Sequence, residues 1–255
     1  SINEMEITKG DSLYVSSSFG MLGFPSFKIS NDQDISRVFF EIIIDILGNE
    51  GTLFAPTFTY SFSKKKKISK NIFNIDKTIS KVGPFGEYLR KHKNSIRSKD
   101  PMISITGYGK EASILLEQQN TSYGDGCIFD RLRKINNLKI LNLGVGANYI
   151  PFIHYVDYLS KCKHRFNKFF EGIIIKDKKK EHVRWHYPVA YKKNWAIADG
   201  HKLANKALNK IIYKNILGEG NIYCSDYDKL FKFCLKEAKN NPWITAIGKN
   251  EKQKN

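Results

Sequence analysis

The sequence predicts an α/β fold in which a central β-sheet is flanked by helices. Two short apolar runs, Asp11–Ser16 and Gly51–Phe54, have the composition of strands, and each leads into small or hydroxylated residues. Between them, Asp34–Leu47 repeats its apolar residues at helical spacing and ends at Gly48. This alternation is typical of a sheet covered by helices. Because the 255 residues contain no internal repeat and no linker rich in Gly, Ser or Pro, we predict one domain over residues 1–255.

The middle of the chain continues this alternation. Ser61–Lys81 is polar and rich in Lys, which predicts a surface loop, and Gly83–Lys91 has a proline in its first turn, as short helices often do. Ile96–Ile105 is predicted to be a loop that leads into a strand. Lys139–Val145 predicts a buried strand, and Asn148–Leu159 predicts a loop followed by a helix.

The last third of the chain has a different pattern. Arg165–Ile175 and His182–Tyr191 read as two hairpin strands that flank a charged turn at Asp177–Glu181. Tyr227–Ala238 is amphipathic and predicts a helix. The terminal residues 249–255 are polar and predict a disordered tail.

The composition excludes several classes of protein. Hydrophobic residues make up 41% and charged residues 26% of the chain, which argues against general disorder. No apolar run approaches the roughly 20 residues that span a bilayer, and the first residues lack the zones of a secretory signal. We therefore expect a soluble, cytoplasmic protein without membrane insertion. The four cysteines form no CxxC pair, so we expect free thiols.

The net charge of +17 indicates an affinity for anions. The chain has 42 Lys and Arg against 25 Asp and Glu, with dense basic runs only at Lys64–Lys67, Lys176–Lys180 and Lys249–Lys254. No nucleic-acid-binding motif accompanies these runs, so we do not expect nucleic acid as a partner. Solvated surface lysines and an anionic small molecule, such as a phosphorylated cofactor, both remain open as explanations of the charge.

Two groups of residues have the chemistry of a catalytic site. His154 and Asp157 lie three residues apart on a predicted helix, so both project from one face, and a carboxylate beside an imidazole orients it for general-base catalysis. Ser16, Ser17 and Ser18 follow a strand, where hydroxyl and backbone N–H groups can bind a phosphate or a carbonyl oxygen. A surface ion pair and an ordinary polar loop explain the same patterns, so spacing alone leaves both alternatives open.

Other positions are less informative by themselves. His182 and His186 have the i,i+4 spacing of a metal pair, but their neighbours predict a strand and no HExxH glutamate follows, so no metal is expected. The remaining candidates lie in segments that a turn or a salt bridge would equally explain: Thr57, Phe58, Arg97, Ser98, Asp100, Tyr123 and Asp125.

Taken in order, seven segments resemble those of the aminoglycoside 3-N-acetyltransferase family. They are VSSSFGMLG (Val15–Gly23), GTLFAPTFT (Gly51–Thr59), VGPFGEYLR (Val82–Arg90), RSKDPMIS (Arg97–Ser104), YGDGCIFDRL (Tyr123–Leu132), LGVGANYIPFIHYVD (Leu143–Asp157) and GEGNIYCSDYDKLFKFCL (Gly218–Leu235). No single segment is specific, but their order covers nearly the whole chain. The resemblance implies a single-domain α/β fold that differs from the GNAT acetyltransferases.

The resemblance also implies transfer of an acetyl group from acetyl-CoA to the primary amine of a sugar. His154 matches the family's histidine and would accept a proton from the attacking amine, while Asp157 stands in place of the family's glutamate and would orient His154. Cofactor contacts are implied for Ser16, Ser17, Ser18, Thr57, Arg97 and Ser98. Substrate contacts are implied for Phe58, Asp100, Tyr123 and Asp125. Part of the positive charge of the protein would then bind the phosphates of CoA.

Two departures from the family pattern bear on the acceptor. Asp100 replaces a loop histidine, and Ser16 replaces the histidine before the serines. Together with the basic surface, they favour an amino sugar linked to a nucleotide, as in the synthesis of lipopolysaccharide O-antigen or capsule. The alternatives are an aminoglycoside acceptor, as in antibiotic resistance, and a non-enzymatic module that binds anions or nucleic acid. The oligomeric state is left open, a homo-oligomer included.

Overall fold

The computed structural model of the chain describes residues 5–24, 32–63, 68–191 and 197–248. The predicted tail at 249–255 and the basic runs at 64–67 and 249–254 lie outside these residues. The strands are β1 (Ser12–Ser17), β2 (Thr52–Pro56), β3 (Ile72–Asn74), β4 (Ile96–Arg97), β5 (Ile105–Gly109), β6 (Leu138–Leu143), β7 (Arg165–Lys176), β8 (Lys179–Ala190), β9 (Ile197–Ala198), β10 (Tyr213–Leu217), β11 (Gly220–Asp226) and β12 (Ala246–Ile247).

Helices cover and connect these strands. The α-helices are α1 (Asp32–Leu47), α2 (Pro84–Lys91), α3 (Ile128–Leu132), α4 (Ile153–Leu159), α5 (His201–Ala207) and α6 (Tyr227–Asn240). Short 3-10 helices are η2 (Phe19–Leu22), η3 (Ile68–Lys70) and η4 (Ala112–Glu117). None of the helices in the described ranges is long and apolar enough to cross a lipid bilayer.

The central sheet has seven strands in the order β10-β11-β6-β1-β2-β5-β4. Strand β1 pairs in parallel with both β2 and β6, and Ser16 of β1 lies opposite Asn142 of β6. The chain therefore leaves β1 toward β2 on one side and later returns to β6 on the other side. In open α/β sheets, ligands bind beyond the carboxyl ends of the strands at such a switch point. This edge is where the fold predicts a site.

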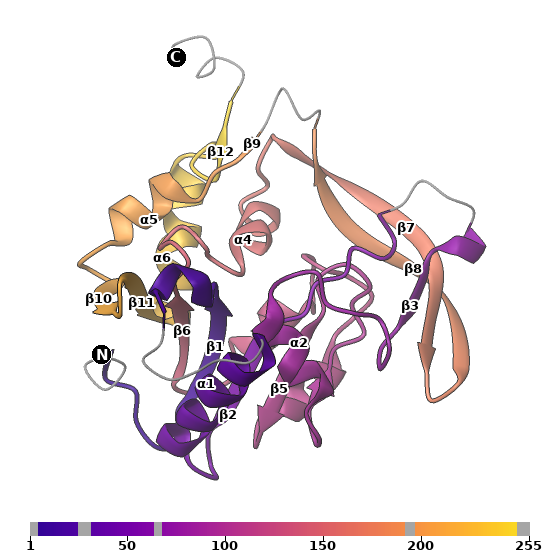
Figure 1. Ribbon diagram of the computed structural model, residues 1–255. Coiled ribbons are helices and arrows are strands. Elements are labelled where there is room, and N and C mark those ends of the chain that lie inside the picture. Colours follow the sequence, from indigo (N-terminus) through magenta and orange to yellow (C-terminus); the bar gives the residue numbers. More distant parts are fainter. Residues whose placement is uncertain (1–4, 25–31, 64–67, 192–196, 249–255) are drawn as a thin grey trace.

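The two faces of the sheet are covered by different helices, which confirms the predicted α/β fold with a central sheet and flanking helices (Figure 1). Successive residues of a strand point to opposite faces. Leu13 and Val15 pack in one buried cluster with α1 and α2, whereas Tyr14 packs in a second cluster with α3, α4 and α6. The second cluster lies on the same side of the sheet as α4, the helix that carries His154.

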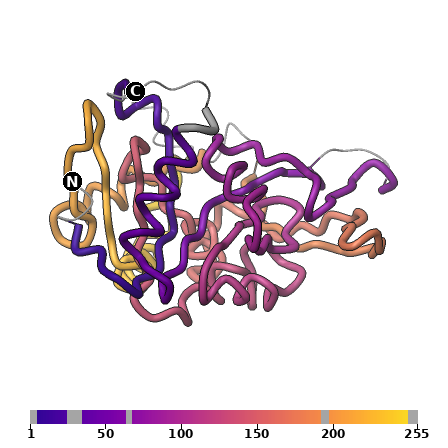
Figure 2. The backbone as a smooth tube through the Cα atoms, turned by 60° about the horizontal axis from the view of Figure 1, so that its bottom comes forward, coloured from indigo at the N-terminus to yellow at the C-terminus, as the bar shows by residue number. Residues whose placement is uncertain are grey.

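A separate sheet of three strands, in the order β3-β7-β8, is built around a long hairpin. The hairpin extends away from the central sheet in both views (Figures 1 and 2). Its two strands pair from Arg165 opposite Ala190 to Lys176 opposite Lys179, so Asp177 and Lys178 form a two-residue turn. Both turn residues have positive φ angles, 48° and 66°, as a type I′ hairpin turn requires. The observed turn is therefore shorter than the predicted turn at Asp177–Glu181.

The predicted elements are present, with small shifts of their ends and several omissions. The predicted surface loop Ser61–Lys81 contains η3 and β3, because Phe73 is buried in the core and β3 pairs with β7. The short elements β9, α5, β10 and β12 were not predicted. Each has at most seven residues, too few for a hydrophobic period to be recognised.

Candidate active site

The candidate site begins where β6 ends and the chain turns toward α4. Gly144, directly after β6, has a φ of 69°, and a side chain there would collide with the carbonyl oxygen of Ser18. The glycine therefore lets the loop after β6 lie against the loop after β1. The side-chain amide of Asn142 donates to the carbonyl oxygens of Gly146 (3.0 Å) and Tyr149 (3.2 Å) and fixes the path of this loop. Helix α4 then places His154 in its first turn.

His154 and Asp157 form the pair that their spacing predicts. Nδ1 of His154 lies 3.0 Å from Oδ2 of Asp157. The imidazole side chain is 18% exposed, whereas the Asp157 side chain is only 1% exposed. The ring edge of Tyr123 packs against the imidazole with 5.3 Å between ring centroids. The histidine thus keeps some contact with the exterior, and the carboxylate lies behind it.

Asp157 is held by several donors from distant parts of the chain. Oδ2 also accepts from Nε of Arg165 at 2.8 Å, and Oδ1 accepts from the hydroxyl of Thr245. Nε2 of His164 lies 3.5 Å from Oδ1. Burial alone would raise the pKa of Asp157, but the hydrogen bonds from His154 and His164 and the charge of Arg165 hold it well below its usual range. Asp157 is therefore ionised when His154 is neutral.

Arg165 also contacts the far side of the imidazole. Its NH2 group lies 3.0 Å from Nε2 of His154, and its NH1 group donates to the carbonyl oxygen of Pro188 at 3.0 Å. Burial, followed by the charge of Arg165, lowers the pKa of His154, although Asp157 opposes this shift. The imidazole is consequently neutral at physiological pH, which is the form that a general base needs.

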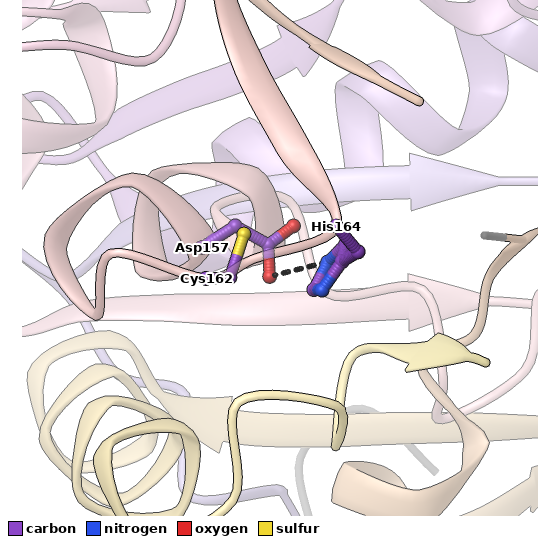
Figure 3. A group of neighbouring side chains, drawn as sticks. All are labelled: Asp157, Cys162 and His164. Atoms are coloured by element: carbon purple, nitrogen blue, oxygen red, sulfur yellow. Dashed lines mark ion pairs between the residues drawn. The ribbon is translucent and has the colours of Figure 1, made fainter. Parts of the chain in front are cut away.

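Asp157, Cys162 and His164 lie close together, with side chains of the types that bind zinc (Figure 3). Both oxygens of Asp157, however, already accept hydrogen bonds from protein donors. A cation here would have to displace these donors and would lie beside the guanidinium of Arg165. We therefore interpret the group as support for Asp157. Burial raises the pKa of the Cys162 thiol to about 12, so this thiol stays protonated.

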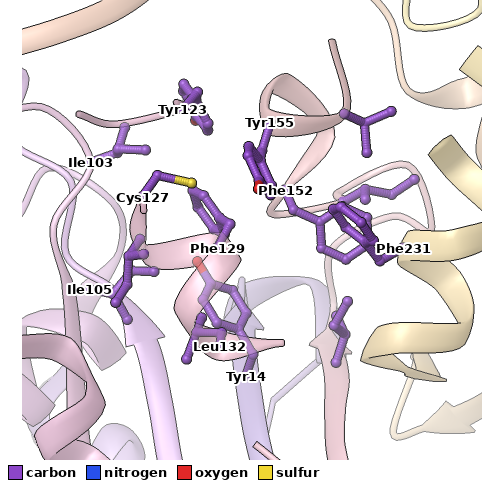
Figure 4. Packing of buried hydrophobic residues seen from close by; sticks show 14 of the residues in the cluster. Tyr14, Ile103, Ile105, Tyr123, Cys127, Phe129, Leu132, Phe152, Tyr155 and Phe231 are labelled. Carbon is purple, nitrogen blue, oxygen red and sulfur yellow. The ribbon is translucent and has the colours of Figure 1, made fainter. Parts of the chain in front are cut away.

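Tyr123 forms part of an aromatic wall beside His154. It is buried, stacks on Phe129 at 5.5 Å between centroids, and meets Tyr187 edge-on at 5.4 Å. Figure 4 shows Tyr123, Cys127 and Phe129 on one side of the cluster and Tyr155 on the other. Tyr123 contacts the imidazole of His154, and its expected contact with substrate stays a prediction.

The serine loop after β1 contains three differently exposed side chains. Ser16 is buried, Ser17 is half-buried and Ser18 is exposed. The hydroxyl oxygen of Ser16 has no hydrogen-bond partner within the described residues, nor does the hydroxyl of Tyr14 or Oδ1 of Asn142. Ser16 lies opposite Asn142 in the sheet and shares a face with Tyr14. Two residues with an unsatisfied side-chain oxygen, Ser16 and Asn142, therefore lie opposite each other near the carboxyl ends of β1 and β6.

Arg97 and Thr57, for which cofactor contacts are expected, form a buried network within the protein. The guanidinium of Arg97 donates to Ser104 Oγ (3.1 Å) and to the carbonyl oxygens of Ile75 (3.0 Å), Thr78 (2.6 Å) and Thr57 (2.8 Å). The hydroxyl of Thr57 donates to the carbonyl oxygen of Ser104 at 3.0 Å. The polar groups of Arg97 and Thr57 are therefore hydrogen-bonded within the protein, and these bonds connect the loops that carry Ile75, Thr78 and Ser104.

Ser98, another expected cofactor residue, also bonds within the protein. Its side chain is fully buried, and its hydroxyl accepts from the backbone N–H of Ile105 at 3.0 Å. Its own backbone N–H donates to the carbonyl oxygen of Ile105 at 2.8 Å. Ser98 thus joins the end of β4 to the start of β5 and has no surface for a cofactor.

Asp100, for which a substrate contact is expected, is hydrogen-bonded within a buried loop. It is 0% exposed, and Oδ1 accepts from the backbone N–H groups of Met102 (2.7 Å) and Ile103 (2.9 Å) and from the hydroxyl of Ser122 (3.0 Å). Oδ2 accepts from the side-chain amide of Gln118 at 2.9 Å. Burial raises the pKa of Asp100 against these hydrogen bonds.

The two remaining predicted substrate residues differ in exposure. Phe58 is buried and packs edge-on against Tyr60 with 6.2 Å between centroids. Asp125 is exposed and accepts a hydrogen bond from the hydroxyl of Tyr158 at 3.3 Å. Asp125 also lines a cavity of about 540 Å³ together with Tyr158, Arg165 and Asn167. Asp157, the hydrogen-bond partner of His154, is also part of the wall of this cavity.

The sequence over residues 28–237 matches the family described as aminoglycoside 3-N-acetyltransferase. The chain belongs to this family. No curated protein matches the sequence significantly. The predicted family and its enzyme class, a CoA-dependent N-acetyltransferase with acetyl-CoA as donor, are confirmed.

Solved structures of similar proteins support the same fold. An AAC-IIIb enzyme described as a binary complex with CoASH has 14% identity, covers 94% of this chain and 93% of its own, and has a TM-score of 0.78. The aminoglycoside acetyltransferase AAC(3)-Xa has 16% identity, coverage of 94% and 90%, and a TM-score of 0.76. The YokD protein from Bacillus subtilis has 17% identity, coverage of 94% and 96%, and a TM-score of 0.73. At these identities the likeness shows the fold alone.

The residues at the sheet edge fit the donor of an aminoglycoside 3-N-acetyltransferase. Buried polar atoms without partners are costly unless a ligand or water satisfies them. The amide groups of the pantetheine arm of acetyl-CoA can both donate and accept, so they suit the unpartnered oxygens of Ser16 and Asn142. Ser17 and Ser18 at the same edge keep exposed surface for the rest of the donor.

Three residues of the site were missed at the sequence level: Arg165, His164 and Thr245. Arg165 and His164 follow α4 closely, and a basic residue so near a His–Asp pair was a usable signal. Thr245 lies 88 residues beyond Asp157, and nothing in the sequence around it indicates the contact.

Proposed function

We propose that the protein transfers the acetyl group of acetyl-CoA to a primary amine of an aminoglycoside-type amino sugar, with His154 as general base. One observation carries this proposal: Nδ1 of His154 lies 3.0 Å from the buried carboxylate of Asp157. That hydrogen bond leaves Nε2 as the nitrogen that can accept a proton. The half-buried imidazole stays neutral, because burial and Arg165 lower its pKa.

The reaction is a direct transfer between two bound substrates. Acetyl-CoA supplies the acetyl group as an activated thioester. Nε2 of His154 accepts a proton from the acceptor nitrogen as that nitrogen forms its bond to the acetyl carbon and the carbon–sulfur bond breaks. Asp157 stabilises the imidazolium and holds its ring orientation. The proton then passes to the sulfur of the leaving group, which restores neutral His154.

The position of the acidic and basic residues favours an aminoglycoside-type acceptor over a nucleotide-linked one. The net charge and the replacements at positions 16 and 100 favour a nucleotide-linked sugar at the level of the sequence. Asp100 is buried in a loop, so its identity does not act on an acceptor directly. A dense group of lysines, Lys176, Lys179 and Lys180, lines a different cavity at the far end of the hairpin. Asp125, beside the catalytic pair, is exposed and suits an ammonium group.

A comparison of acceptors tests this proposal. Purified protein is assayed with acetyl-CoA and either gentamicin-type aminoglycosides or nucleotide-linked amino sugars, and release of the CoA thiol is measured. We expect the higher kcat/KM with an aminoglycoside. A higher kcat/KM with the nucleotide-linked sugar would contradict the proposal and support the nucleotide-linked acceptor that the net charge favours.

A further inference from the structure

The guanidinium of Arg165 contacts Nε2 of His154, the nitrogen that accepts the proton in the proposed reaction. Its side chain is 8% exposed, and three of its N–H groups are engaged, by Asp157 Oδ2, by the carbonyl oxygen of Pro188 and by Nε2 of His154. A guanidinium has N–H donors and no acceptor. Nε2 must therefore be the unprotonated nitrogen of a neutral ring, with the ring proton on Nδ1. While Arg165 stays in this position, the only lone pair of the proposed base is already in use.

The cavity beside Arg165 gives the guanidinium a place to move. This cavity of about 540 Å³ is lined by Arg165 itself and by Asp125, Asn167 and Tyr158. Asp125, whose Oδ2 accepts from the hydroxyl of Tyr158, offers its carboxylate to a displaced cation, whereas Oδ1 of Asn167 lies 3.0 Å from Nε2 of His186. An amine N–H of the acceptor would donate to Nε2 from the position that the Arg165 NH2 group now holds, 3.0 Å away.

We propose that Arg165 is a positioning residue that holds the place of the acceptor amine at His154 Nε2 and leaves this place when the acceptor binds. This role rests on the proposed function, because it assumes that His154 receives the proton of the acceptor. In the resting enzyme, Arg165 fixes the tautomer and orientation of the imidazole. In the complex, its displacement frees the lone pair.

The charges around the imidazole give the proposal a pH-dependent readout. His154 is faced by Asp157 on its own helix, by Arg165 on β7, by His164 behind the carboxylate and by the ring of Tyr123. Arg165 disfavours the imidazolium, so its removal raises the pKa of His154. A base works only in its neutral form, so the acidic limb of kcat/KM against pH must then move upward.

Arg165→Met tests the proposal in the whole protein, with Arg165→Lys as the conservative variant. We expect Arg165→Met to move the acidic limb upward in pH. Above that limb, the KM of the acceptor should fall severalfold because the acceptor no longer competes with the guanidinium, while kcat stays within about tenfold of wild type. Arg165→Lys keeps the charge and should return the limb toward wild type. Arg184→Met is the matched control, since Arg184 is exposed on β8 and packs on Phe169.

Two results would overturn the proposal. One is a loss of kcat at every pH with an unmoved acidic limb and unchanged KM, which is the behaviour of a purely structural arginine. The other comes from nitrogen NMR of histidine-labelled protein without substrates, with the His154 signal assigned from a His154→Gln spectrum. An Nε2 shift that is equal in wild type and Arg165→Met would exclude the contact. Because this measurement needs no reaction, it separates a failure of the Arg165 role from a failure of the proposed function.

Discussion

At the scale of single residues, the catalytic pair is the part of the site that the sequence predicts well. His154 and Asp157 are three residues apart on one helix, and helix geometry alone brings such residues together. The other groups around the carboxylate depend on how separate elements meet. Arg165 reaches Asp157 from the first residue of β7, and Thr245 reaches it from beside β12, so only the assembled fold shows the full set of donors.

Asp157→Asn should reduce the dependence of stability on acid pH. The hydrogen bonds from His154 and His164 overcome the effect of burial and keep the folded-state pKa of Asp157 below its unfolded value of about 3.9. The unfolded chain therefore binds a proton first, so the contribution of Asp157 is present above that unfolded pKa and lost as the pH falls toward the folded one. Urea unfolding between pH 2.5 and 7 should give a shallower fall in the free energy of unfolding for Asp157→Asn than for wild type. Parallel curves would show that the carboxylate is not held as described.

At the scale of elements, the loops around the site hold residues that sequence reasoning assigned to ligands. Arg97 and Ser98 match family positions and Asp100 replaces a family histidine, and the sequence places all three in a loop where we expect contacts to a ligand. In the structure, the side chains of these three residues form hydrogen bonds with backbone groups. Sequence patterns cannot distinguish the two uses, because a residue that binds a ligand and one that satisfies a buried backbone group have the same chemistry.

Asp100→Ala should destabilise the protein while changing substrate binding little. The change leaves the backbone N–H groups of Met102 and Ile103, the hydroxyl of Ser122 and the amide of Gln118 without this acceptor in a buried loop. We expect a loss of about 3 kcal/mol or more in the free energy of unfolding, measured in urea. The exposed Asp76→Ala serves as the control and should stay within about 0.5 kcal/mol of wild type. If Asp100→Ala is as stable as wild type and has a raised KM for the acceptor, Asp100 contacts the substrate and the structural role is wrong.

At the scale of the whole molecule, alternation of strands and helices predicts the class of fold, but not the order of the strands. Strand β1 pairs in parallel with β2, about 40 positions away in the sequence, and with β6, more than a hundred positions away, and these two pairings create the edge at which the site lies. The net charge of +17 is also a property of the whole chain. Its distribution, with a lysine group at the far end of the hairpin, is visible only in three dimensions.

Ligand-dependent thermal stability tests whether the basic surface has a role outside catalysis. We expect acetyl-CoA to raise the Tm, since a ligand that binds only the folded state stabilises it by RT ln(1 + [L]/Kd). A mixed-sequence oligonucleotide should leave the Tm unchanged. A shift with the oligonucleotide alone, lost at raised salt, would instead support the module that binds nucleic acid.

The imidazole of His154 is the group on which this account depends most. Its most direct test is the kcat of His154→Ala against that of wild type, at saturating acetyl-CoA and aminoglycoside, with the fold of the variant checked by circular dichroism. Loss of a general base predicts a fall of about 10²–10⁴-fold. A folded His154→Ala protein that turns over at the wild-type rate would contradict the mechanism.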